Sequence, residues 1–130
     1  MSDQITRLQD IIVTLRGPNG CPWDQAQTFE TMTQYIREES EELISAIESQ
    51  NIESIKNELG DVLLHVIMLS QMAEEKKWFQ LNDVAESSIN KMIRRHPHVF
   101  GDTKVNSIED VLKNWEKIKQ AEKNSKNIST

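Results

Sequence analysis

The chain has 130 residues, 37% of them hydrophobic and 28% charged, and its formal net charge at pH 7 is −6. This length suits a single globular domain whose core needs no disulfide or metal for support. The negative charge argues against a surface that coats nucleic acid, because such a surface needs a dense field of lysine and arginine. An anionic small molecule is compatible with this charge if metal ions and local cations neutralise it.

The sequence also indicates the compartment. Cys21 is the only cysteine, which excludes an internal disulfide and any Cys-x-x-Cys zinc pattern. No apolar run approaches the length of a membrane span, and His65 interrupts the most apolar stretch. The first residues do not resemble a signal peptide. We therefore expect a cytoplasmic protein without a membrane partner.

Helical periodicity covers almost the whole chain. Apolar side chains recur at spacings of three and four, which is typical of amphipathic helices. The predicted helices cover, approximately, residues 3–16, 28–49, 52–76, 82–96 and 107–122. We find no convincing strand in the sequence. The predicted fold class is therefore all-α, a helical bundle with one domain over residues 1–122 and a polar, frayed tail over 123–130.

Turn and capping residues set the limits of these helices. A turn-rich loop over residues 17–24 ends the first helix. Only Gln50 and Asn51 separate the second helix from the third, so these two should form an antiparallel hairpin. The predicted N-terminal caps are Asp83 with Glu86 for the fourth helix and Ser107 with Asp110 for the fifth.

Two groups of carboxylates lie in the two helices of this predicted hairpin. The first is Glu38-Glu39-x-x-Glu42 and the second is Glu58-x-x-Asp61. Glu39 and Glu58 each stand where the apolar stripe of their helix should continue. Residues three or four apart share one face of a helix, so each helix should present a pair of carboxylates to its packed side.

This arrangement predicts a metal site. Buried unpaired charges are costly and like charges repel, so four inward carboxylates need a cation between them. Oxygen ligands suit a hard divalent ion such as Mg²⁺, with Mn²⁺ as a possible substitute. The alternative is that the acids are solvated residues of an acidic helix face, as we expect for Glu41, Glu48 and Glu53. Gly60, inside the third helix, indicates either close helix packing or backbone that comes near the bound ligand.

A cluster of cations and a tryptophan each have two possible roles. Lys91, Arg94 and Arg95 share one side of the fourth predicted helix. They either interact with the helix dipole and nearby acids or recognise phosphate oxygens, for which the arginine fork is well shaped. Trp115 lies on the apolar stripe of the fifth helix, where it either packs in the core or stacks on a nucleobase.

Together these motifs resemble those of a known family. The segments concerned are Gly20-Cys21-Pro22-Trp23-Asp24, Glu38-Glu39-x-x-Glu42, Glu58-Leu59-Gly60-Asp61 and Arg94-Arg95-His96-Pro97-His98-Val99-Phe100. With them the chain resembles the MazG nucleoside triphosphate pyrophosphohydrolases over nearly its whole length. The resemblance implies an all-α fold, a homodimer or higher homo-oligomer, and Mg²⁺-dependent cleavage of nucleoside triphosphates to monophosphate and pyrophosphate. Such an activity would remove surplus or damaged nucleotides.

The resemblance also implies roles for individual residues. The implied metal ligands are Glu39, Glu42, Glu58 and Asp61. Glu38 would be a further acid near the metal or its water, and so the candidate catalytic residue. The implied substrate contacts are Lys91, Arg94 and Arg95 to phosphates and Trp115 to the nucleotide. Apolar stripes on more than one side of the helices independently favour self-association, because one short bundle does not cover them all.

The chain departs from the family pattern in ways that keep a second function open. Long members contain two such domains; the chain resembles the first, whereas catalysis is usually ascribed to the second. In that second domain a lysine commonly stands where this chain has Tyr35. The alternative is a catalytically weak or inactive dimerisation or regulatory module that retains the metal site. A ferritin-like di-iron bundle fits less well, because it needs Glu-x-x-His in two helices and His65 follows Asp61 by four.

Overall fold

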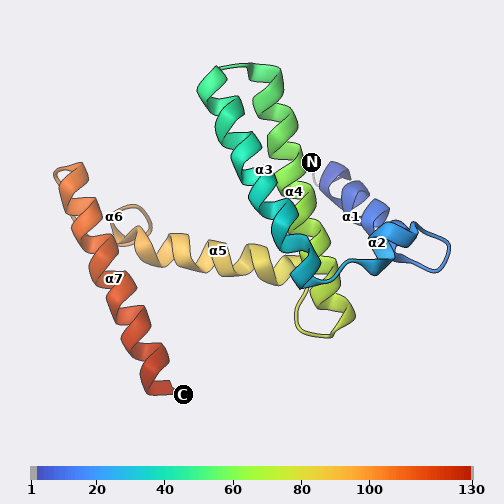
Figure 1. Cartoon of the computed structure of the whole chain (residues 1–130). Coiled ribbons are helices and arrows are strands. Elements are labelled where there is room, and N and C mark those ends of the chain that lie inside the picture. Colours follow the sequence, from blue (N-terminus) through green and yellow to red (C-terminus); the bar gives the residue numbers. More distant parts are fainter. Residues whose placement is uncertain (1–2, 130) are drawn as a thin grey trace. The chain divides into compact units, whose positions relative to one another are not determined.

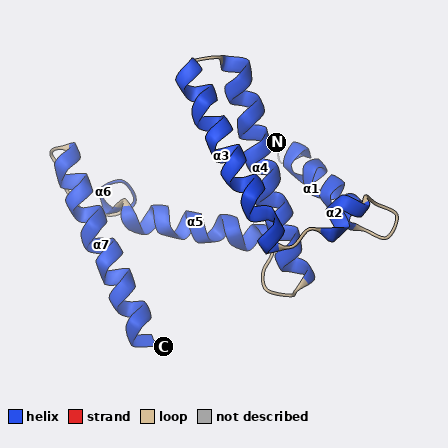
Figure 2. Ribbon diagram, in the orientation of Figure 1, coloured by secondary structure: helices blue, strands red, loops and turns tan. Residues whose placement is uncertain are grey.

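The computed structural model describes residues 3–129, which form seven helices and no strand. The helices are α1 Asp3–Arg16, α2 Pro22–Ala26, α3 Phe29–Ser49, α4 Ile52–Glu75, α5 Leu81–Arg95, α6 Pro97–Phe100 and α7 Ile108–Ser129 (Figures 1 and 2). The all-α prediction is confirmed. No helix in this part of the chain combines the length and apolar character that crossing a membrane requires.

The chain divides into two compact units at the start of α5. Residues up to Leu81 form the first unit, and the residues from Asn82 onward form the second. The predicted domain limits, 1–122 and 123–130, stay a prediction. The helix boundary within them was wrong, because α7 continues to Ser129. The ion pairs of Glu122 with Arg94 and Arg95 hold α7 to α5 directly before this added stretch.

The predicted hairpin of α3 and α4 is the centre of the first unit. Thr28 caps α3 through its side chain, which accepts a hydrogen bond from the backbone N–H of Thr31. Gln50 ends α3 in the left-handed conformation, and the side chain of Asn51 caps α4. The two helices therefore run antiparallel across a very short turn (Figure 1). This tight connection fixes which residues of α3 and α4 lie opposite one another.

The core of the first unit lies among α1, α3 and α4. Its buried residues are Ile12, Met32, Ile67, Met68 and Met72. Helical periodicity predicts that Ile47 of α3 and Leu59 and Val66 of α4 belong to the apolar stripes of the hairpin. This prediction was wrong for all three, because they are 54%, 52% and 39% exposed. The buried positions of α3 are instead Met32, Glu39 and Ala46, seven residues apart. A spacing of seven is two helical turns, so α3 buries a narrow seam with a glutamate at its midpoint.

The connections differ from prediction at three places. The loop predicted over 17–24 contains the start of the short helix α2, whose first residue is Pro22. Helix α5 begins at Leu81, so Asp83 lies inside its first turn rather than at the predicted cap. The turn around Pro97 forms the short helix α6. The cap at Ser107 is confirmed: its hydroxyl accepts a hydrogen bond from the Asp110 N–H at 3.1 Å.

The second unit has little core of its own. No residue between Asn82 and Lys126 is buried. Its apolar side chains with exposures of 55% or more are Ile89, Val99, Phe100, Ile108 and Leu112. Contacts among polar and aromatic side chains of α5, α6 and α7 hold the unit together, and these contacts include two of the residues predicted to bind phosphate.

Candidate functional site

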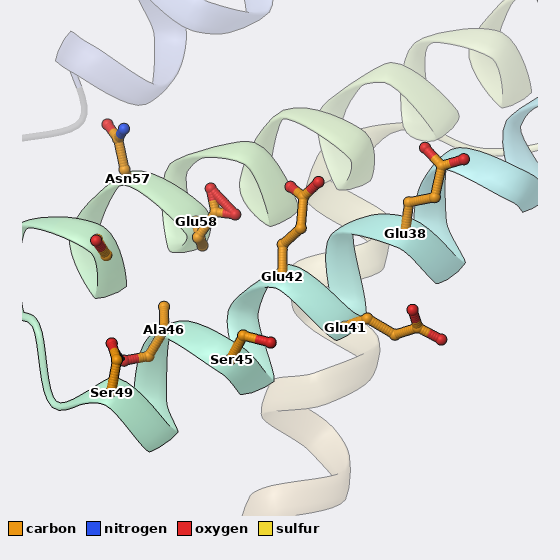
Figure 3. A pocket seen from close by; sticks show the side chains of 9 residues that line it. Glu38, Glu41, Glu42, Ser45, Ala46, Ser49, Asn57 and Glu58 are labelled. Carbon is orange, nitrogen blue, oxygen red and sulfur yellow. Dashed lines mark hydrogen bonds between the residues drawn. The ribbon is translucent and has the colours of Figure 1, made fainter.

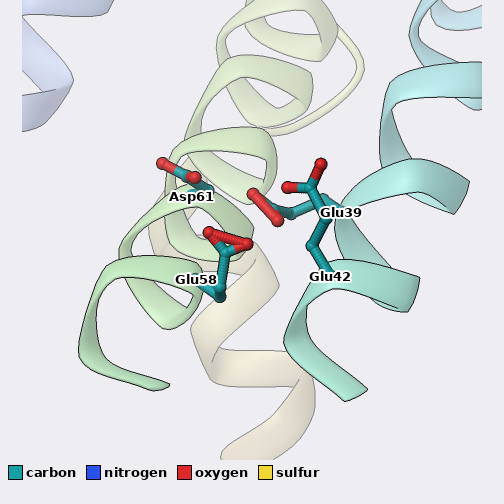
Figure 4. A group of neighbouring side chains, drawn as sticks. All are labelled: Glu39, Glu42, Glu58 and Asp61. Atoms are coloured by element: carbon teal, nitrogen blue, oxygen red, sulfur yellow. The ribbon is translucent and has the colours of Figure 1, made fainter. Parts of the chain in front are cut away.

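The four predicted metal ligands converge on one point between α3 and α4. Glu39 and Glu42 come from α3, Glu58 and Asp61 from α4, and one carboxylate oxygen of each lies within 4.8 Å of the others. Figure 4 shows the four side chains pointing toward one another across the hairpin. The spacing of three within each helix and the short turn between the helices produce this convergence. Among the described residues, this is the only such group of potential metal ligands.

The four acids differ in exposure. Glu39 is 5% exposed, and its Oε2 atom is buried with no hydrogen-bond partner. Glu58 is half-buried, whereas Glu42 and Asp61 are exposed. The prediction that both pairs face the packed side is therefore right for one member of each helix. The cluster is a cleft with a buried floor and an open rim, which allows a ligand to enter.

Burial and mutual repulsion hold protons on this cluster. Burial, followed by the neighbouring carboxylates of Asp61, Glu42 and Glu58, raises the pKa of Glu39 from 4.5 to about 8. Burial also raises the pKa of Glu58, with further contributions from Glu42 and Asp61. In the metal-free protein both shifts favour the neutral carboxyl group over the charged carboxylate.

This donor set fits a hard divalent cation. All four groups are carboxylates, and oxygen-only sets suit Mg²⁺, Mn²⁺ or Ca²⁺ better than zinc. The orphaned Glu39 Oε2 supplies an acceptor aimed into the cluster with no donor to satisfy it. His65 lies one turn beyond Asp61 but is not part of the four-residue group, so the cluster lacks the Glu-x-x-His pairs of a ferritin-like site.

Two cavities adjoin the cluster. The larger has a volume of about 630 Å³ and runs along the hairpin toward its turn, as Figure 3 shows. Its lining residues are Glu38, Glu41, Glu42, Ser45, Ala46, Ser49, Ser54, Asn57 and Glu58. The smaller, of about 200 Å³, is lined by Tyr35, Leu64 and His65 in addition to Glu38, Glu39, Glu42 and Asp61. Glu38, the candidate catalytic residue, is exposed and lines both cavities.

Sequence reasoning missed most of the larger groove. Ser45 follows Glu42 by three residues, Ser49 follows Ser45 by four, and Ser54 precedes Glu58 by four. These spacings place them on the same helix edges as the acids. The signal was present in the sequence, but serines on a helix surface are common and gave no reason to select them.

The predicted phosphate-binding cations lie in the second unit. Arg94 and Arg95 both donate hydrogen bonds to the carboxylate of Glu122 on α7. Lys91 is exposed, one turn earlier on α5. The guanidinium carbon of Arg95 lies 5.3 Å from the ring centroid of Trp115, a cation–π arrangement. The structure thus groups both arginines with Trp115, and it adds Glu122, which sequence reasoning did not select.

His96 completes this aromatic and cationic group. Its ring packs edge-on against Trp115 at 5.2 Å, and its Nδ1 is 2.6 Å from the carbonyl oxygen of Met92. Trp115 is half-buried rather than enclosed in a core. This exposure argues against ordinary core packing of Trp115, one of its two predicted roles. Part of its ring is accessible, which the other role, stacking on a nucleobase, requires.

Comparisons with known proteins agree with these features. The family model for the MazG nucleotide pyrophosphohydrolase domain matches residues 27–100, which include both acidic groups and both arginines. A nucleoside triphosphate pyrophosphohydrolase of Escherichia coli K12 is 43% identical over 125 residues, covering 95% of this chain and 48% of that protein. A nucleoside triphosphate pyrophosphohydrolase/pyrophosphatase MazG of Thermotoga maritima is 47% identical over 122 residues, covering 94% of this chain and 46% of that protein.

A solved structure shares the fold. The crystal structure of a mazG-related protein from Thermotoga maritima superposes with a TM-score of 0.71 and 27% identity, covering 88% of this chain and 98% of that one. The chain spans about half the length of the two curated relatives described above. The acidic hairpin, the family match and the shared fold all give the same assignment: this chain belongs to the MazG nucleotide pyrophosphohydrolase domain family.

Proposed function

We propose that this chain hydrolyses nucleoside triphosphates to nucleoside monophosphate and pyrophosphate, with Mg²⁺ held by the four carboxylates. The observation that carries the proposal is the convergence of Glu39, Glu42, Glu58 and Asp61 within the segment that matches the family. The names of the E. coli and T. maritima relatives support the reaction. Mn²⁺ should substitute for Mg²⁺, because it has the same preference for oxygen ligands.

The residues in and around the acidic cluster support a distinct role for each group. A divalent ion bound there supplies positive charge for the phosphates and Lewis acidity toward a bound water. Glu38 borders both cavities beside the cluster, so its carboxylate is available to orient the attacking water and accept its proton. Glu39, on the buried floor, would hold the cation as a carboxylate, so the proton that burial favours on it would have to leave.

The resemblance to the family also assigns cations of the second unit to the substrate. A triphosphate carries more negative charge than the cation at the cluster can offset, since the four acidic ligands already consume part of that charge. Lys91, Arg94 and Arg95 are assigned to the phosphate oxygens, where they stabilise the charge that develops on the leaving pyrophosphate. Trp115 is assigned to the nucleotide, and its partly exposed ring is compatible with stacking on a base.

The proposal includes a homodimer or higher homo-oligomer in the cytoplasm. Ile44, Ile47, Ile52 and Leu59 each expose more than half of their surface on the hairpin, and exposed large apolar residues in such number favour an interface. A second copy of the chain would cover such a face symmetrically. Light scattering at micromolar concentration tests this, because a mass near the 15.0 kDa monomer would contradict it.

The activity is tested by product analysis. Purified protein with Mg²⁺ should release pyrophosphate, and not phosphate, from at least one nucleoside triphosphate in a panel of common and modified nucleotides. EDTA should abolish the release. Glu48→Gln is the matched control for changes in the cluster, because Glu48 is an exposed acid of the same helix outside both cavities.

A specific observation favours a second candidate, a regulatory module that binds nucleotide without turnover. Tyr35 lines the cavity beside the cluster, where catalytic domains of the family commonly bear a lysine. A phenol contributes no positive charge toward a phosphate. Mg²⁺-dependent nucleotide binding without release of pyrophosphate from any nucleotide of the panel would establish this candidate in place of the enzyme.

A further inference from the structure

The carboxylate of Glu122 bridges two neighbouring arginines within the second unit. Its Oε2 accepts hydrogen bonds from Arg94 Nε at 2.6 Å and Arg95 Nε at 3.4 Å, and its Oε1 accepts one from Arg95 Nη2 at 2.7 Å. The side chains of Arg95 and Glu122 are only 16% and 19% exposed. The guanidinium groups assigned to phosphate are therefore already holding an anion.

The surroundings of Glu122 are better suited to an anion with more charge. Lys91 lies one turn before the arginines on α5, and Lys119 lies one turn before Glu122 on α7. Arg95 also lies against the ring of Trp115. One carboxylate thus faces two guanidinium groups. The donor fork that holds a carboxylate by paired N–H···O bonds holds a phosphate equally well.

We propose that Glu122 is an internal competitor for phosphate: it occupies Arg94 and Arg95 in the free protein and is displaced when a polyphosphate binds. The inference rests on the proposed role of these arginines in substrate binding. Competition lowers the apparent affinity of every anion by the same factor, the fraction of protein with free arginines. Inorganic phosphate and monophosphates, which bind weakly, then stay unbound, while a triphosphate still displaces the carboxylate. Glu122 thereby sets an affinity threshold that a triphosphate passes and that inorganic phosphate or a monophosphate does not.

The contrasting view is that Glu122 only fastens α7 to α5. A salt bridge with only this structural role stabilises the fold, and Glu122 would then affect anion affinity only through its charge. The two views make opposite statements about anion affinity when the carboxylate is removed. Glu116 offers a matched control, because it acts on Arg95 through its charge and carries the same charge as Glu122.

The test is calorimetric titration of the full chain with inorganic tripolyphosphate and with inorganic phosphate. EDTA keeps the acidic cluster free of metal, so that the second unit alone is expected to bind. Glu122→Gln should tighten tripolyphosphate binding about tenfold, since charge-assisted pairs with arginine are among the stronger ones. Glu116→Gln should tighten it by no more than about twofold, because exposed charges are screened by salt. Equal effects of the two variants would overturn the inference.

Two further measurements keep the proposal testable if Glu122→Gln unfolds. In the wild-type protein, the ¹³C carboxylate signal of Glu122 should shift when tripolyphosphate saturates the chain, and an unchanged signal would overturn the inference. Arg95→Ala should weaken tripolyphosphate binding. If it does so while Glu122→Gln fails to tighten binding, only the competitor role is wrong. If Arg95→Ala has no effect, the phosphate assignment itself is wrong and the inference is overturned with it.

Discussion

The acidic cluster of the first unit and the arginine–glutamate cluster of the second unit handle buried charge in opposite ways. Four carboxylates converge within 4.8 Å, and the buried Glu39 Oε2 has no hydrogen-bond partner. In the second unit, Glu122 pairs with Arg94 and Arg95 through short hydrogen bonds. The first cluster is uncompensated without a ligand, whereas the second is already compensated within the chain.

Because of this difference, the functional assignments of the two clusters need different tests. An uncompensated cluster costs the fold free energy, so its presence itself indicates a ligand. A compensated cluster stabilises the fold without any ligand, so its functional role must be tested by competition. Substitutions in the two clusters should therefore have effects of different size, and those in the acidic cluster should have the largest.

Removing a charge from the acidic cluster should have the largest effect. Glu42→Gln and Asp61→Asn keep the shape of the side chain and remove a ligand charge, and both residues are exposed, so the helical fold should persist. We expect the rate of pyrophosphate release to fall about a hundredfold or more, because even indirect supporting residues of metal sites are worth 10- to 100-fold. Calorimetric titration with Mg²⁺ or Mn²⁺ should show weaker binding. Unchanged affinity in both variants, with Glu48→Gln as the control, would refute the metal assignment.

Removing an arginine from the second cluster should slow turnover through the transition state. Arg94→Ala or Arg95→Ala should lower kcat on the order of a hundredfold, the usual cost of losing a donor to developing charge. Circular dichroism and thermal unfolding monitor the fold, because both variants also remove a partner of Glu122. Loss of activity by unfolding would appear equally in Glu122→Gln, which breaks the same contacts. Full activity in both arginine variants would exclude a role in catalysis.

The pH dependence of stability should have opposite signs in the two clusters. The raised pKa of Glu39, about 8, means that the folded protein retains a proton that the unfolded chain releases near 4.5, so stability falls as pH rises from about 4.5 through 8. Arg95 and Arg94 lower the pKa of Glu122 to about 2, so its contribution is present above about 4.5 and is lost as pH falls toward 2.

Urea unfolding in EDTA measures both dependences. Glu39→Gln should flatten the decline between pH 5 and 8, and Glu122→Gln should flatten the decline below pH 4.5. Mg²⁺ affinity should also fall as pH drops below about 8, by up to about tenfold per unit, because the cation must displace a proton. A Mg²⁺ affinity independent of pH between 6 and 8 would show that Glu39 is ionised before the cation binds.

The sequence predicted the acidic cluster because its geometry is local. Spacings of three within each helix and a two-residue turn between the helices suffice to place Glu39, Glu42, Glu58 and Asp61 together. Exposure was harder to predict, because Leu59 follows the helical period of α4 and yet is 52% exposed. Burial depends on which faces of a helix meet neighbours, and this is set by tertiary packing.

The second cluster shows the other limit of sequence reasoning. The sequence pattern groups Arg94 with Arg95, but their partner Glu122 is 27 residues away from Arg95 on another helix. No periodicity links positions in separate helices. A frayed tail was also predicted from residue 123 onward, whereas α7 continues through these residues to Ser129.

The smallest effect is expected at Gly60, which lies inside α4 directly before Asp61. A mid-helix glycine costs roughly 0.5–1 kcal/mol relative to alanine. A Cβ atom added at Gly60 would meet no atom within 4 Å, so close packing within the chain does not explain this glycine. Gly60→Ala should therefore raise the free energy of unfolding by about that amount. Gly20→Ala is the contrasting variant, because its Cβ would overlap the carbonyl oxygen of Leu15 and should destabilise the protein. The kcat of Gly60→Ala tests the role of Gly60. An unchanged kcat in the stabilised variant means that no ligand occupies the space beside its Cα atom. A lower kcat means that substrate approaches the backbone beside Asp61.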